Sequence, residues 1–171
     1  MPPDTPGTNT SLTYGPEPTP VNYHQFLLAE WSDAPPTPPA DRPANGLITP
    51  DPPWGAVIYT GIATGAVAVS VELRRQAPPP GAPSWDEWEE VAEVTVEAPV
   101  GQLRVYALME DPPDLPPLTI AGPGTYRVRV HARGRDIAYD LSLVDEIVED
   151  YLIQVWPGPP GPEVIHKQAD V

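Results

Sequence analysis

Residues 124–156 read GTYRVRVHARGRDIAYDLSLVDEIVEDYLIQVW, the longest stretch of the chain without proline. The chain has 28 prolines among 171 residues, so this stretch indicates backbone whose N–H groups are needed for hydrogen bonds, as in the central strands of a sheet. Its first part alternates between apolar side chains (Tyr126, Val128, Val130, Ala132) and polar ones (Thr125, Arg127, Arg129, His131, Arg133). The alternation predicts a strand with one buried and one wet face, whereas residues 151–156, with apolar side chains on both sides, predict a strand covered on both faces.

Outside this stretch, prolines cluster between segments of apolar residues. These segments predict further strands at Pro20–Glu30, Leu47–Thr49, Trp54–Thr60, Ala66–Leu73 and Gln102–Met109, and one turn of helix at most in Ser84–Glu90, followed by a strand. The pattern is typical of an all-β, single-domain β-sandwich, jelly-roll-like, with about eight short strands and Pro-rich loops. We expect residues 20–157 to form this domain, between flexible tails at residues 1–19 and 158–171.

The chain is strongly acidic, with 24 acidic against 9 basic residues and a formal net charge of −15. This charge disfavours nucleic acid or an anionic membrane as a direct partner and favours a basic protein. A second interpretation stays open, in which the acidity only keeps the protein in solution. No apolar run approaches the ~20 residues of a membrane span, and residues 1–15 lack a secretory signal, so we expect a cytoplasmic location.

The sequence predicts neither a catalytic nor a cofactor site. The chain has no cysteine, which excludes disulfides and thiolate metal sites. His24, His131 and His166 are scattered, without a second ligand at a metal-like spacing. No phosphate-binding glycine loop or nucleophile motif is present, so we expect a protein that is not an enzyme, although two carboxylates from distant loops could meet without a sequence signature.

Two acidic segments are the candidate partner-binding sites, because residues 86–97 and 136–150 each carry six acids and no base. The candidate residues are Asp86, Glu87, Glu89 and Glu90 in the first segment and Asp145, Glu146, Glu149 and Asp150 in the second. In an extended chain, Glu87, Glu89, Glu93 and Glu97 share one face, with same-face neighbours ~6.8 Å apart. This spacing is comparable to that of phosphates along a nucleic-acid strand, so mimicry of DNA is geometrically possible.

The same glutamates have an alternative role inside the fold. Arg127, Arg129 and Arg133 form a row of opposite sign that could lie across from them as cross-strand ion pairs. The second acidic segment has no basic row nearby in sequence. It is therefore the better candidate for contact with another protein.

Four short motifs carry a resemblance to a known family. They are Tyr23-His24-Gln25-Phe26, Gly46-Leu47-Ile48, the Pro-Gly-x-Tyr turn at Pro123, Gly124 and Tyr126, and Tyr151-Leu152-Ile153. In order and spacing, from about residue 20 to residue 157, they resemble the competence protein J family. The resemblance implies an inhibitor that binds a DNA-entry nuclease and keeps it silent in the cell that makes it.

An acidic protein suits this role, because a nuclease presents a cationic surface to phosphate. Immunity proteins against toxin nucleases would have the same character. Two other classes stay open: a jelly-roll-like binding module for a small molecule or carbohydrate, and a structural protein. A nuclease or toxin gene beside this one would favour the inhibitor, whereas sugar-metabolism genes would favour the binding module.

Overall fold

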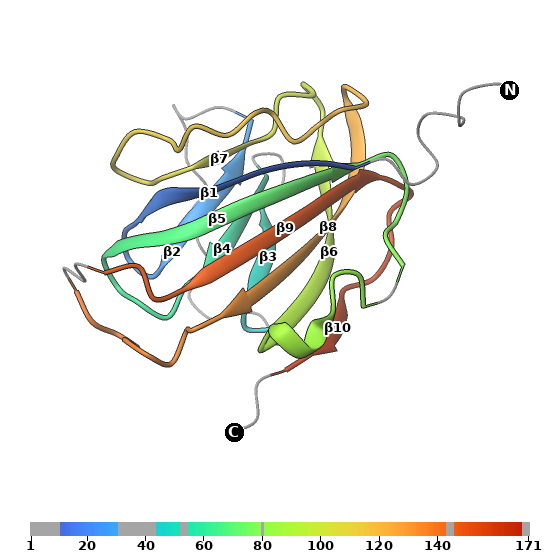
Figure 1. Cartoon of the computed structure of the whole chain (residues 1–171). Coiled ribbons are helices and arrows are strands. Elements are labelled where there is room, and N and C mark those ends of the chain that lie inside the picture. The colour runs from blue at the N-terminus through green and yellow to red at the C-terminus, as the bar shows by residue number, and fades with distance from the viewer. Residues whose placement is uncertain (1–10, 31–43, 52–54, 80, 143–145, 169–171) are drawn as a thin grey trace, which may run out of the picture.

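The computed structural model describes residues 11–30, 44–51, 55–79, 81–142 and 146–168. They form two open β-sheets packed against each other, so the predicted all-β sandwich is confirmed (Figure 1). The larger sheet has six strands, in the order β1 (Ser11–Val21), β5 (Gly65–Arg74), β9 (Asp150–Pro157), β8 (Gly124–Arg133), β6 (Glu90–Ala98) and β10 (Val164–Lys167). The smaller sheet has four, in the order β3 (Ile48–Asp51), β4 (Gly55–Tyr59), β2 (Gln25–Ala29) and β7 (Arg104–Tyr106). One turn of 3-10 helix, η1 (Trp85–Glu87), precedes β6.

The core lies between the sheets and follows the alternation of the sequence. The inward side chains are buried in β5 (Val67, Val69, Val71, Leu73) and in β8 (Tyr126, Val128, Val130, Ala132). From the smaller sheet, Phe26 packs edge to face on Tyr151, with ring centroids 5.3 Å apart. Burial of each large apolar side chain contributes about 1.5–3 kcal/mol, so this pattern is the main source of stability.

The proline-free strand β8 lies inside the larger sheet. It pairs antiparallel with β6 on one side and with β9 on the other, while β9 pairs parallel with β5. At the end of β8, Ala132 lies opposite Glu90, the first residue of β6, and Arg133 lies opposite Asp150, the first residue of β9. Two segments far apart in sequence therefore enter the sheet at the same end.

The expected domain boundaries at residues 20 and 157 are too narrow, because β1 and β10 lie in the segments expected to be tails. β1 pairs with β5 along its length, at the edge of the sheet. Ala68, opposite Pro18, donates its N–H away from β1 to the carbonyl oxygen of Glu149 (3.0 Å), so Pro18 and, two residues on, Pro20 have ring nitrogens that face away from β5, and no ladder hydrogen bond is lost. β10 pairs with β6, and the preceding turn is held by Arg127, whose guanidinium donates to the carbonyl oxygens of Gly161 (3.0 Å) and Pro162 (2.9 Å).

The strand predicted over Pro20–Glu30 is interrupted by a tight turn. Tyr23 and His24 have φ angles of 54° and 62°, and the turn passes the chain from β1 in one sheet to β2 in the other. Such turns usually carry Asn-Gly, because positive φ is costly for other residues. The pair Tyr-His gives no turn signal, which explains the missed break.

The outer face of β8 is buried rather than wet, which corrects the prediction from its alternation. Arg127, Arg129 and His131 are 7%, 5% and 0% exposed. Glu93 of β6 bridges the two arginines, 2.8 Å from Arg127 Nη2 and 3.0 Å from Arg129 Nε. The guanidinium of Arg129 also lies over Trp156, 5.1 Å from the ring centroid. The predicted cross-strand pairing of acid and arginine is thus confirmed for Glu93.

The burial of His131 predicts a pH-dependent stability. Its Nδ1 is 3.1 Å from the carbonyl oxygen of Leu152, and burial lowers its pKa from 6.5 to about 4. Because the pKa of His131 is lower in the folded than in the unfolded protein, burial of the neutral ring contributes stability above pH 6.5. This contribution, on the order of 3 kcal/mol, is lost as the pH falls toward 4. Urea unfolding at pH 7 and pH 4.5 should show a smaller loss for His131→Gln than for the wild type. The same loss in both proteins would contradict this assignment.

Candidate functional site

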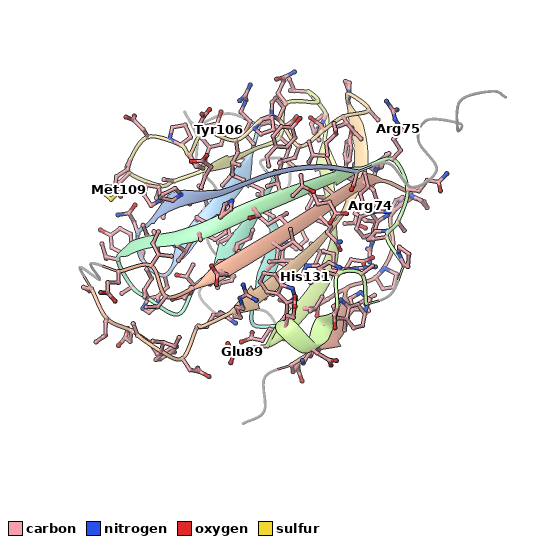
Figure 2. The ribbon with its side chains drawn as sticks, in the orientation of Figure 1. Arg74, Arg75, Glu89, Tyr106, Met109 and His131 are labelled. Carbon is pink, nitrogen blue, oxygen red and sulfur yellow. The ribbon has the colours of Figure 1, made fainter. Side chains whose placement is uncertain are left out.

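Acidic side chains from both predicted segments meet at the end of β8. Glu87 and Glu89, which precede β6, line a surface hollow of about 310 Å³ together with Asp150 of β9 and with Asp136, just beyond β8. The neighbouring hollow, about 330 Å³, shares Glu87, Glu89 and Asp136 and adds Asp86. In Figure 2, Glu89 lies close to the end of β8, where the β8–β9 connection leaves the sheet. We call Asp86, Glu87, Glu89, Asp136 and Asp150 the acidic surface.

This arrangement follows from the strand order. Glu89 donates its backbone N–H to the carbonyl oxygen of Ala132 (3.0 Å), and its carboxylate accepts from the backbone N–H of Gly134. Arg133 Nε donates to the Asp150 carboxylate (3.1 Å). The two acidic segments are therefore fixed to the same strand end, although each was predicted as a separate site. Asp136 belongs to the second segment but is not among the predicted contact residues. The acids beside it follow from the strand order β9-β8-β6, which the sequence does not show.

Two cations lie within the acidic surface and are held in place. The guanidinium of Arg133 lies 4.6 Å from the Trp88 ring centroid, and its ion pair with Asp150 is about half exposed, so solvent screens it. Lys167 donates to the carbonyl oxygen of Trp85 (2.7 Å). Within the described part of the chain, no hydrogen bond or ion pair engages the carboxylates of Asp86, Glu87, Asp136 and Glu146. These exposed carboxylates can meet a cationic partner without first breaking an internal pair.

Two of the predicted partner-binding residues are structural instead. Glu90 is paired with Arg135, and burial raises its pKa despite this cation. Glu149 is 0% exposed and accepts hydrogen bonds from Gly61 N (2.9 Å), Ile62 N (2.7 Å) and the hydroxyl of Tyr151 (2.6 Å). The prediction that Glu149 contacts a partner is therefore wrong.

The remaining candidates have mixed outcomes. Glu146 is exposed on the β8–β9 connection, and Asp145 lies outside the described residues. The predicted row of Glu87, Glu89, Glu93 and Glu97 is not a continuous anionic face, because the side chain of Glu93 is buried. Burial alone raises the pKa of Glu93, but hydrogen bonds from His166, Arg127 and Arg129 lower it below its usual value. Glu93 is a carboxylate neutralised within the fold.

The structure adds few other chemical possibilities. Among the residues it describes, no three His, Asp or Glu side chains are grouped so that they could hold a metal ion. No helix in the described ranges is long and apolar enough to cross a membrane. Comparisons with protein-family models, with curated proteins and with solved structures find no match. The resemblance to the competence protein J family stays a prediction.

The structural role of Glu149 predicts a sharp contrast between two neighbouring acids. Glu149→Ala leaves two backbone N–H groups and a tyrosine hydroxyl buried without an acceptor, so it should lower the free energy of unfolding by about 3–5 kcal/mol. Glu146→Ala, at an exposed position, should change it by less than about 0.5 kcal/mol. Denaturant titration of both variants measures the difference. Equal destabilisation would show that the buried carboxylate does not hold the turn.

Proposed function

We propose that this chain is a nuclease inhibitor, an acidic protein that occupies the cationic DNA-binding surface of its partner. The observation that supports the proposal is the convergence of carboxylates from two distant segments at the end of β8. Asp86, Glu87 and Asp136 are exposed there and are not engaged by other described side chains. A nuclease must present cations to phosphate, and such a surface attracts fixed carboxylates in the same way.

Charge and rigidity act at different steps of this binding. The formal net charge of −15 steers diffusion toward a basic partner and raises the association rate, an effect that salt weakens. Hydrogen bonds between Glu89 and the end of β8 hold the backbone of the acidic surface, so binding costs mainly the rotamer freedom of its exposed side chains. Competition with DNA follows, because both ligands require the same cations.

The partner is a competence DNA-entry nuclease, as the family resemblance implies, or a nuclease toxin against which this chain gives immunity. Both present a cationic groove, so one surface chemistry serves either role. In either case the protein acts in the cytoplasm of the cell that makes it. It is not itself an enzyme, and it contacts neither DNA nor membrane directly.

Two variants with the same net charge test the proposal. Asp86→Lys, Glu87→Lys and Asp136→Lys together alter the acidic surface, whereas Glu110→Lys, Asp111→Lys and Asp114→Lys alter exposed acids on the β7–β8 loop. Each triple variant changes the charge from −15 by six, to −9. Figure 1 places the β7–β8 loop at the upper left, far from η1. The two variants thus separate the position of the charge from its amount.

The tagged wild type is used to retain nucleases from an extract of the producing organism, and each retained nuclease is purified and assayed for cleavage of plasmid DNA. The wild type and the loop variant should inhibit cleavage alike. The surface variant should bind at least about tenfold more weakly, mainly through slower association. Equal inhibition by both variants would place the binding site elsewhere. Cleavage that continues in the presence of the wild type would contradict the proposed function.

A further inference from the structure

Large apolar side chains are exposed beside the acidic surface. Tyr23 and Ile137 are each 71% exposed, Tyr139 and Leu141 are each 57% exposed, and Ile147 is 44% exposed. We call these five residues the apolar tip. An exposed apolar cluster with a charged border is typical of a protein interaction site.

Direct contacts hold the elements of the apolar tip together. The backbone N–H of His24, next to Tyr23, donates to Ala63 O (3.0 Å), and the N–H of Ala63 donates to Leu141 O (2.8 Å). The ring of His24 lies 6.3 Å from that of Tyr139, and its Nε2 is 2.8 Å from the Asp140 carboxylate. The β1–β2 turn, the β4–β5 turn and the β8–β9 connection therefore form one surface.

The apolar tip is also continuous with the acidic surface. Ile137 lines the same hollow as Glu87, Glu89 and Asp136. Val148, which follows Ile147 in sequence, lines that hollow as well. Carboxylates therefore border the apolar side chains on this side of the tip.

The backbone of the tip is held in an unfavourable conformation. Among the described residues, those other than glycine with positive φ are Tyr23 (54°), His24 (62°) and Asp140 (62°), which belong to the apolar tip or directly follow one of its residues in sequence. Asparagine or glycine would adopt such angles more readily than an aromatic residue. Retained backbone strain of this kind clusters at functional surfaces, which makes this turn a candidate for one.

We propose that the apolar tip is the central contact of the docking surface, and that the partner is a basic protein whose cationic face carries an exposed apolar patch. This inference rests on the proposed function and specifies its partner. The carboxylates steer the encounter, while burial of the tip slows dissociation. A second copy of this chain is a poor occupant, because its own acidic border would face the first across a two-fold axis.

Two synthetic peptides of equal length and equal charge test the inference on the full-length protein. One alternates Lys with Leu, and the other alternates Lys with Ser. The wild type should bind the Lys-Leu peptide at least about tenfold more tightly, because at least one large apolar side chain becomes buried. Raising the salt concentration should abolish binding of the Lys-Ser peptide first, since that complex depends on charge alone. Fluorescence anisotropy measures both affinities.

Substitutions then test which residues cause the preference for the Lys-Leu peptide. Tyr23→Asn combined with Ile137→Ser should reduce the ratio of the two affinities to less than about threefold, while the affinity for Lys-Ser stays unchanged. Asparagine suits the positive φ at position 23, so the variant should unfold at or above the wild-type temperature, which separates lost contact from lost folding. Val100→Ser is the matched control. Val100 is 50% exposed and lies beyond the far end of β6, so its substitution should leave the ratio unchanged.

The possible outcomes distinguish failure of this inference from failure of the proposed function. Equal affinities of the wild type for the two peptides would overturn the apolar contact and leave the acidic surface standing. If neither peptide shows salt-dependent binding, both the apolar contact and the proposed inhibition through the acidic surface are contradicted. A dimer of the wild type that dissociates in the tip variant, seen by analytical ultracentrifugation, would make a second copy the occupant and overturn the choice of a basic partner.

Discussion

The buried carboxylate of Glu149 connects the segments on which the proposed docking surface depends. It accepts the backbone N–H groups of Gly61 and Ile62 and so fixes the β4–β5 turn against the start of β9. The same turn contacts the β8–β9 connection, because Gly61 O accepts from Asp140 N at 2.8 Å. The approach is close enough that a Cβ at position 61 would lie 2.0 Å from Arg135 O, which only glycine permits. One charge in the interior thereby fixes the turn against which Asp140 and Leu141 of the β8–β9 connection are held.

The acids named above form two groups, one neutralised within the fold and one exposed, and the composition of the chain does not distinguish them. Glu93, Glu90 and Glu149 are neutralised within the fold by arginine side chains or by backbone N–H groups. Asp86 and Asp136 remain exposed. The net charge therefore measures neither stability nor binding by itself. Which group an acid joins depends on the side chains and backbone groups that the fold places beside it.

The sequence predicts the fold better than the site, for physical reasons. Alternation along one strand depends only on its own residues, so β5 and β8 were readily predicted. The same rule places Glu149 on the inward face shared with Tyr151, so alternation along the strand also indicates the burial of this carboxylate. The meeting of Asp136 with Glu87 depends on the order β9-β8-β6, which alternation does not contain. Strand β1 is not predicted because residues 1–19 are rich in Pro, Thr and Gly and poor in apolar side chains, whereas an edge strand accepts such prolines.

Those prolines have a consequence for aggregation. The outer edge of a sheet offers free N–H and C=O groups on which a strand of another molecule can add, and long edges are a risk at the high concentrations of a crowded cell. In β1, Pro18 and Pro20 remove N–H groups from the outward edge, and at the opposite edge β10 spans only Val164–Lys167. Neither edge is a good template for growth of the sheet. The prolines that make the sequence look unfolded thus leave the edge of the folded sheet with fewer N–H groups on which another strand could pair.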